Sequence, residues 1–338
     1  MAASTSSEFT RANLTAESFI NTSCAIYGRS GSGKSKIIQH ILYLLRDSNP
    51  TTVVFSMSEG RNHAYSDAMV PRILVHDRVS EEVIQEIAEK QTRKKKIYDR
   101  ANNIQTLDSL FARVATEQQR LVRAEMQRAF DEVASQRPID EITRNKFTDM
   151  LISFFHRVLD PMESRLRRVS DLSDNERFAV EWFQFNPRIT IVFDDCSTEL
   201  QKLRTCGDAL ELIFQGRHGF CTTVIAAHAE TCLAPAARSN ITQSFFTDQT
   251  VANQFAMRQN NAFSRERRAE IMRYAAQIHT TTPPTPPYTK MLYANDRPML
   301  VEVPDHQPFS AVSREVRTCC ATMTKQDGGI EPWMKALM

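Results

Sequence analysis

Short apolar runs alternate with stretches of helical periodicity over much of the chain, and this alternation predicts an α/β protein. The apolar runs are rich in β-branched or aromatic residues, which is typical of strands buried on both faces of a parallel sheet. The predicted strands are 24–27, 51–56, 189–195, 221–227 and 244–247, and residues 70–75 return to an extended pattern.

Helical spacing of apolar residues dominates the region between residues 80 and 185. We expect a helical segment from Ser80 to about Ala134 and a second helix from about Glu141 to Leu159. A capping box that starts at Ser173 opens a short helix through Trp182. This region separates the first strands from the later ones and is predicted to be a helical insertion or lid. Other helices are predicted at 37–45, 198–214, 251–257 and 264–278.

The predicted organisation begins with a flexible lead-in at 1–20, which is followed by one α/β domain at 21–279 that contains the insertion at about 80–185. The stretch TTTPPTPPY at 280–288 predicts a stiff, extended linker. Residues 289–338 lack clear periodicity apart from 299–303 and are predicted to form a C-terminal tail or small appendage.

Composition narrows the class of protein without identifying it. The chain has 338 residues, of which 41% are hydrophobic, so it can bury a sizeable core. A net charge of +2 does not indicate a polyanion partner, so any surface for nucleic acid must be local. The seven cysteines show no metal-ligand spacing and are interpreted as reduced thiols. No signal peptide and no membrane span are recognisable, which favours a soluble intracellular protein.

Residues 28–35 match the phosphate-binding motif G-x-x-x-x-G-K-[ST] without a mismatch. A predicted strand precedes the motif and a predicted helix follows it, which is the context that the motif requires. Its glycines let backbone N–H groups turn toward phosphate oxygens at the helix N-terminus. Lys34 would reach the β- and γ-phosphates of ATP, and Ser35 would bind Mg²⁺. The predicted cofactor-binding residues are Gly28, Arg29, Ser30, Gly31, Ser32, Gly33, Lys34 and Ser35.

The strand predicted at 189–195 ends in two carboxylates, Asp194 and Asp195. A parallel strand delivers such a residue to the carboxyl edge of its sheet, where ligands bind. With the phosphate-binding loop upstream, Asp194 is interpreted as the residue that holds Mg²⁺ or its water. Asp195 would either polarise the attacking water as a general base or cap the next helix. The expected fold is therefore a P-loop NTPase, RecA/ASCE-like, with a mostly parallel sheet flanked by helices and a helical insertion between the second strand and the acidic strand at 189–195.

The order of short motifs resembles that of the genome-packaging ATPases of large double-stranded DNA viruses, the poxvirus-type branch of the FtsK–HerA superfamily. The motifs are the P-loop, FDDCS at 193–197, GRH at 216–218 and RSN at 238–240, and the resemblance covers residues 20–250 without the insertion. It implies an ATPase that forms a homo-oligomeric ring around duplex DNA and translocates that DNA into a capsid. A capsid or vertex protein would be a partner, and the protein would act in the host cytoplasm or nucleus without membrane binding or secretion.

The resemblance also implies roles for individual residues. Lys34 and Asp195 would be catalytic, and His228 occupies a position where many relatives have a polar sensor, often Gln; a structural histidine is the alternative. Arg217 and Arg238 are candidates for an arginine finger that completes a neighbouring subunit's site, or they are surface ion-pair partners. The basic run 93–96 is a solvated helix face or a contact to the DNA backbone.

Three other functions are compatible with the same motifs. A P-loop kinase of a small acceptor would use the helical region as its acceptor pocket. A non-enzymatic switch would bind ATP and change partners without needing Asp195. A secretion or assembly ATPase of the same superfamily would share the nucleotide core, so the sequence does not separate it from a packaging motor.

Overall fold

The computed structural model describes residues 9–66, 68–136, 138–202, 219–278 and 287–323. The chain forms two compact units, one from Met1–Thr92 with Pro187–Met338 and one from Arg93–Asn186. Each unit has its own apolar core. The second unit begins 13 residues after the start of the insertion that was expected at about 80–185, and it ends one residue after the expected end.

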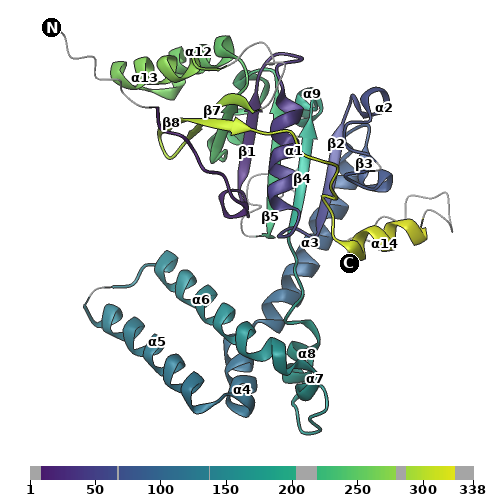
Figure 1. Cartoon of the computed structure of the whole chain (residues 1–338), viewed down its shortest axis with the longest axis vertical. Coiled ribbons are helices and arrows are strands. Elements are labelled where there is room, and N and C mark those ends of the chain that lie inside the picture. The colour runs from purple at the N-terminus through teal and green to yellow at the C-terminus, as the bar shows by residue number, and fades with distance from the viewer. Residues whose placement is uncertain (1–8, 67, 137, 203–218, 279–286, 324–338) are drawn as a thin grey trace. The chain divides into compact units, whose positions relative to one another are not determined.

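The first unit is built on one eight-stranded sheet with the order β3-β2-β4-β5-β1-β6-β7-β8 (Figure 1). Pairing is parallel from β3 through β6 and antiparallel for β7 and β8. The mostly parallel α/β sheet confirms the predicted fold class, and β5 lies between the P-loop strand β1 and the acidic strand β4. The strands are β1 (Ser23–Tyr27), β2 (Thr51–Ser56), β3 (Val75–His76), β4 (Ile189–Asp194), β5 (Cys221–Ala227), β6 (Gln243–Phe246), β7 (Tyr288–Ala294) and β8 (Arg297–Val303).

Strands β1, β2, β4 and β5 are buried at every position, because helices of the same unit flank them. Residues 70–75 have an extended pattern in the sequence, but the structure has a 3₁₀ turn at Arg72–Leu74, which is followed by the two-residue strand β3. The helix predicted at 198–214 is described only as α9, and the rest of it lies outside the described residues. The helices of this unit are α1 (Lys34–Leu45), α2 (Glu59–Asn62), α9 (Ser197–Lys202), α11 (Pro235–Ser239), α12 (Gln249–Met257), α13 (Arg265–Ala275) and α14 (Arg314–Met323).

The two ends of the chain differ from the sequence-based expectation. Residues 289–303, expected in a tail or small appendage, form β7 and β8 and complete the main sheet. Tyr288, assigned to the linker, is the first residue of β7. The described part of the lead-in is also ordered, since Ala12 N donates to Leu300 O at 2.8 Å and Phe19 is fully buried. The sequence did not indicate that these segments join the sheet, because the prolines and the weak periodicity are local features. Pairing of β7 with β6 depends on contacts between residues that are distant in sequence.

The second unit is helical. Helix α3 (Glu81–Ala101) enters it from the first unit, and the long helical segment predicted at 80–134 is divided into α3, α4 (Ile104–Val114) and α5 (Glu117–Gln136). The first break is at Asn103, whose side chain caps α4 by accepting from Thr106 N. The remaining helices are α6 (Glu141–Leu159), α7 (Glu163–Leu166) and α8 (Asp174–Trp182), and the capping box predicted at Ser173 is present.

Two bulk properties can be checked in the described part of the chain. Its cysteines are all free thiols, and Cys24, Cys196, Cys221 and Cys320 are buried. None of its helices is both long and apolar enough to cross a membrane.

Candidate nucleotide-binding site

The P-loop lies between the end of β1 and the start of α1, as its motif requires. Gly31 and Gly33 adopt φ values of 74° and 96°, a left-handed conformation that glycine tolerates best. At position 28 glycine is required for a different reason, which is lack of space: a Cβ atom there would lie 1.9 Å from Thr247 Oγ1. The backbone geometry therefore explains all three glycines of the motif.

Contacts with the β6–α12 connection hold the loop in place. Ser32 Oγ and Thr247 Oγ1 are 2.6 Å apart and share a hydrogen bond. Arg29 Nε donates to Asp248 Oδ2 at 2.8 Å, and the Asp248 side chain also caps α12. Arg29 is thus held by the buried carboxylate of Asp248, and this contact stabilises the loop.

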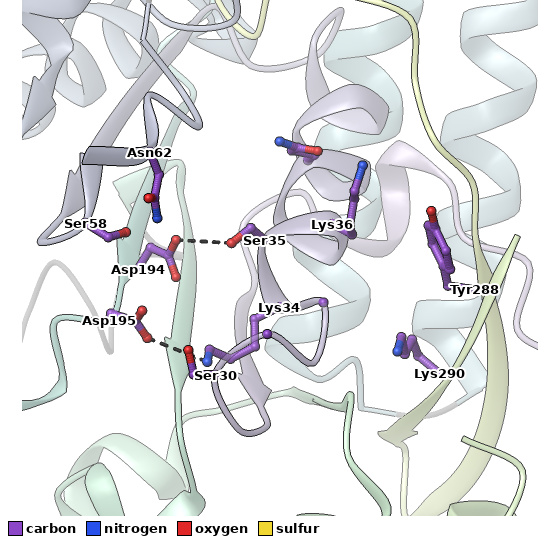
Figure 2. Close-up of a pocket in the computed structure, with 13 residues that line it drawn as sticks. Ser30, Lys34, Ser35, Lys36, Ser58, Asn62, Asp194, Asp195, Tyr288 and Lys290 are labelled. Atoms are coloured by element: carbon purple, nitrogen blue, oxygen red, sulfur yellow. Dashed lines mark hydrogen bonds and ion pairs between the residues drawn. The ribbon is translucent and has the colours of Figure 1, made fainter. Parts of the chain in front are cut away.

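Lys34 is almost fully buried at the start of α1, with 6% of its side chain exposed. Its Nζ donates to Gly28 O at 3.1 Å and to Arg29 O at 3.4 Å. It also lies 3.7 Å from Asp195 Oδ1 (Figure 2). The ammonium group is therefore held between the loop carbonyls and the acidic end of β4, where the phosphate tail of a nucleotide would lie.

Ser35 and Asp194 point toward one another across the site (Figure 2). Ser35 Oγ lies 3.5 Å from Asp194 Oδ2, and hydroxyl and carboxylate oxygens are the ligand types that Mg²⁺ prefers. Two ligands at about 2.1 Å from one octahedral Mg²⁺ would be about 3 Å apart. The slightly wider spacing fits Ser35 as a ligand and Asp194 as a partner of the metal or of its bound water.

Asp194 is 3% exposed and receives a second, shorter hydrogen bond, from Tyr65 OH at 2.7 Å. Burial raises the pKa of Asp194, and the neighbouring Asp195 charge acts in the same direction. The hydrogen bond from Tyr65 and the charge of Lys34 oppose this increase. Tyr65 therefore helps to keep the Asp194 carboxylate ionised, which is the form that can bind a metal ion.

The loop that carries Tyr65 is organised by Glu59, which is buried in α2. The Glu59 carboxylate accepts from the backbone N–H groups of Ala64, Tyr65 and Ser66 at 2.7–3.3 Å. Such an arrangement fixes the loop conformation because each N–H would otherwise lack a partner within the fold. No spacing in the sequence indicates this role, so neither Glu59 nor Tyr65 was predicted.

Asp195 follows β4 with a φ of 56°, in the left-handed region that non-glycine residues seldom adopt. Strained backbone of this kind is concentrated at functional sites. Its carboxylate is 36% exposed and lies between Lys34 Nζ and His228 Nε2, at 3.7 and 3.9 Å from Oδ1. The two predicted residues Asp195 and His228 are thus brought together, with His228 just after β5 and more exposed than Asp195.

A cavity of about 550 Å³ lies beside Lys34, Ser35, Asp194 and Asp195, and His228 is not among the residues that line it. The P-loop and the two aspartates form part of its lining, and β7 contributes two residues that sequence reasoning missed. The strand-like run of β7 was an available signal, but Tyr288 was assigned to the proline-rich linker and the residues after it to the tail. The lining residues are Ser30, Gly31, Gly33, Lys34, Ser35, Lys36, Gln39, Ser58, Asn62, Asp194, Asp195, Tyr288 and Lys290.

Of the two predicted arginine fingers, Arg238 is the one within the described part of the chain, and it is not among the residues that line this cavity. Arg238 lies half-buried on α11. Arg217 lies outside the described residues. Both assignments stay predictions, because an arginine that acts in a neighbouring subunit need not contact the site of its own chain.

No protein-family model matches the chain. It is similar to the uncharacterized protein B354L of African swine fever virus (isolate Pig/Kenya/KEN-50/1950), with 25% identity over 264 residues that cover 74% of this chain and 73% of that protein. The uncharacterized protein 075L of Invertebrate iridescent virus 6 is 36% identical over 66 residues, which are 20% of this chain and 25% of that protein.

Solved structures give distant matches. The pCW3 conjugation coupling protein TcpA, in its monomer form with ATPγS, has a TM-score of 0.38 and 11% identity over 83% of this chain and 60% of TcpA. The plasmid coupling protein TrwB with ADPNP has a TM-score of 0.37 and 12% identity over 91% of this chain and 92% of TrwB. This chain thus spans about 60% of the length of TcpA.

Proposed function

We propose that the chain is an ATP hydrolase that acts as a ring-forming motor and translocates viral double-stranded DNA into a capsid. The observation that carries the hydrolase part is the convergence of Lys34, Ser35, Asp194 and Asp195 at one edge of the sheet. A P-loop alone supports nucleotide binding, whereas two carboxylates beside the phosphate end support metal binding and activation of water.

In this mechanism the buried ammonium of Lys34 moves from the loop carbonyls to the β- and γ-phosphates. Ser35 and Asp194 would hold a Mg²⁺ ion, whose charge would neutralise part of that on the phosphates. Asp195 orients the attacking water and accepts its proton. His228, whose Nε2 lies 3.9 Å from Asp195 Oδ1, donates a hydrogen bond to the γ-phosphate. Binding of the phosphates to Lys34 would also release Asp195 from its ion pair.

The motor part is supported by the order of the P-loop, FDDCS, GRH and RSN motifs and by the viral origin of the relatives. A ring that moves DNA contacts the phosphate backbone without reading bases, so a net charge of +2 is compatible with local basic contacts. An arginine finger from Arg217 or Arg238 would make hydrolysis depend on ring assembly. The ring would act on genome and capsid inside the host cell.

The test is phosphate release by the full chain with and without duplex DNA, at about 50 and 200 mM salt. We expect DNA to stimulate hydrolysis at the lower salt concentration and to lose this effect at the higher one. Lys34→Ala should abolish hydrolysis, and Asp195→Asn should reduce it roughly 10²–10⁴-fold. Lys146→Ala, which changes an exposed lysine on α6, serves as the control for loss of charge.

Three results would contradict the proposal. A folded monomer that hydrolyses ATP at the same rate without DNA is not a DNA motor. Normal turnover by Asp195→Asn would remove this residue from catalysis and favour a switch. Transfer of phosphate to a nucleoside, rather than to water, would identify a kinase.

A further inference from the structure

The cavity beside the P-loop has a second wall that comes from the far end of the chain. Lys290 and Tyr288 belong to β7 and line the same cavity as Lys34 and Ser35. Lys290 contacts Ser32 across a sequence separation of 258 residues. Nothing in the proposed hydrolytic mechanism uses these two residues.

Lys290 directs its charge at the P-loop. Its Nζ donates to Ser32 O at 3.1 Å, and a Cβ atom at Gly33 would lie 3.7 Å from both its Cε and its Nζ. The residue is 2% exposed, and burial lowers the pKa of its ammonium group while the carboxylate of Asp248 opposes this decrease. A buried cation beside a phosphate-binding loop is stabilised further when an anion occupies that loop.

The wall is held in position by a carboxylate shared with α1. Asp305 Oδ1 accepts from Lys36 Nζ at 2.6 Å, and Asp305 Oδ2 accepts from Tyr288 OH at 3.1 Å. Lys36 follows the P-loop serine directly, so this carboxylate joins the first turn of α1 to the first residue of β7. Tyr288 is thereby fixed relative to the loop, and Lys290 is fixed by its own hydrogen bond to Ser32 O.

Figure 2 shows Tyr288 and Lys290 on the opposite side of the P-loop from Asp194 and Asp195. The two aspartates mark the γ-phosphate end of a bound nucleotide, because metal binding and water activation occur there. The β7 residues therefore face the other end of the triphosphate and the nucleoside. Lys36 and Gln39 of α1 also line the cavity.

We infer that Lys290 is a second phosphate-binding lysine, which pairs with the α-phosphate of the nucleotide while Tyr288 contacts its ribose. This inference rests on the proposed function and adds the residues that hold the nucleoside end. It makes Lys290 a binding residue for ATP and ADP alike. Lys34 and the aspartates, by contrast, distinguish the two nucleotides through the γ-phosphate.

The experiment measures binding of mant-ATP and mant-ADP by fluorescence titration, together with steady-state ATP hydrolysis. Lys290→Gln retains a donor for Ser32 O and removes the charge, and Lys290→Met removes both. Loss of one charge-assisted hydrogen bond should weaken binding of both nucleotides by roughly 10- to 100-fold. We expect KM to rise with kcat nearly unchanged, because the contact is the same in ground and transition states.

Controls separate the inference from a structural role and from the proposed function. Lys146→Gln removes an exposed charge in the other unit and should bind both nucleotides normally. If Lys290→Gln binds both as tightly as the unmodified chain, the lysine is only structural and the inference is overturned. Weaker binding of mant-ATP alone would place Lys290 at the γ-phosphate, which also overturns it. Failure of the folded, unmodified chain to bind either nucleotide would instead overturn the proposed function.

Discussion

Gly28→Ala is predicted to damage the P-loop through a steric clash rather than through backbone strain. The added Cβ would lie 1.9 Å from Thr247 Oγ1 and 2.6 Å from Ser32 Oγ. Thr247 cannot move away easily, because it is fully buried and its N–H donates to Tyr27 O at 2.9 Å. Its β-branched side chain also has few alternative rotamers.

The expected cost has two parts. Overpacking of a tightly packed site costs about 1–3 kcal/mol. Separation of the Ser32 and Thr247 hydroxyls, which are 2.6 Å apart, removes a buried hydrogen bond worth about 1 kcal/mol. The free energy of unfolding should therefore fall by about 2–4 kcal/mol in Gly28→Ala.

The measurement is urea unfolding of Gly28→Ala, Thr247→Ala and the double variant, combined in a double-mutant cycle. Thr247→Ala removes the clashing hydroxyl, so the double variant should be more stable than the sum of the single effects by over about 1 kcal/mol. Gly60→Ala is the control, since a Cβ there meets no atom within 4 Å. Additivity within about 0.5 kcal/mol would refute the steric explanation.

Three further predictions concern the catalytic groups. Tyr65→Phe removes the hydrogen bond that lowers the pKa of Asp194, so the acidic limb of the pH–hydrolysis profile should move to higher pH. The control is Tyr274→Phe, which should leave the profile in place because the Tyr274 hydroxyl accepts from Thr10 N outside the site. A profile unchanged by Tyr65→Phe would show that this bond does not tune the carboxylate. Asp194→Asn should abolish hydrolysis. The same variant should raise the melting temperature of the nucleotide-free protein at neutral pH, because the raised pKa of Asp194 means that its ionised carboxylate destabilises the fold. This gain should shrink as pH falls through the pKa of Asp194, and calorimetry at several pH values that finds the variant less stable would contradict it. Mixing inactive Lys34→Ala with inactive Arg238→Ala should restore part of the activity if Arg238 acts in trans, and a mixture that stays inactive at all ratios argues against this finger.

The geometry around the P-loop could be predicted because its information is local. The P-loop places its glycines, Lys34 and Ser35 within eight consecutive residues, and strand and helix patterns flank it. Asp194 could be added because carboxyl ends of parallel strands meet at one edge of a sheet. Capping chemistry is similarly local, and the box at Ser173 is present as predicted.

The rest of the site depends on contacts that no short motif records. Tyr65 reaches Asp194 across 129 residues, and its loop is set by a buried Glu59 that satisfies backbone donors. Lys290 arrives through antiparallel pairing of β7 with β6, which could not be recognised beside a proline-rich stretch. Arg238 and Arg217 stay predictions, because a role in a neighbouring subunit leaves no trace in one chain.

The position of β7 in the sheet has a consequence for how the protein is made. A ribosome will have synthesised the P-loop and both aspartates long before it reaches Lys290, so the nascent chain carries every recognisable motif without a complete binding cavity. Closing that cavity requires contacts such as Lys290–Ser32, which span 258 residues and are slow to form. Nucleotide affinity should therefore develop only in the last stage of folding.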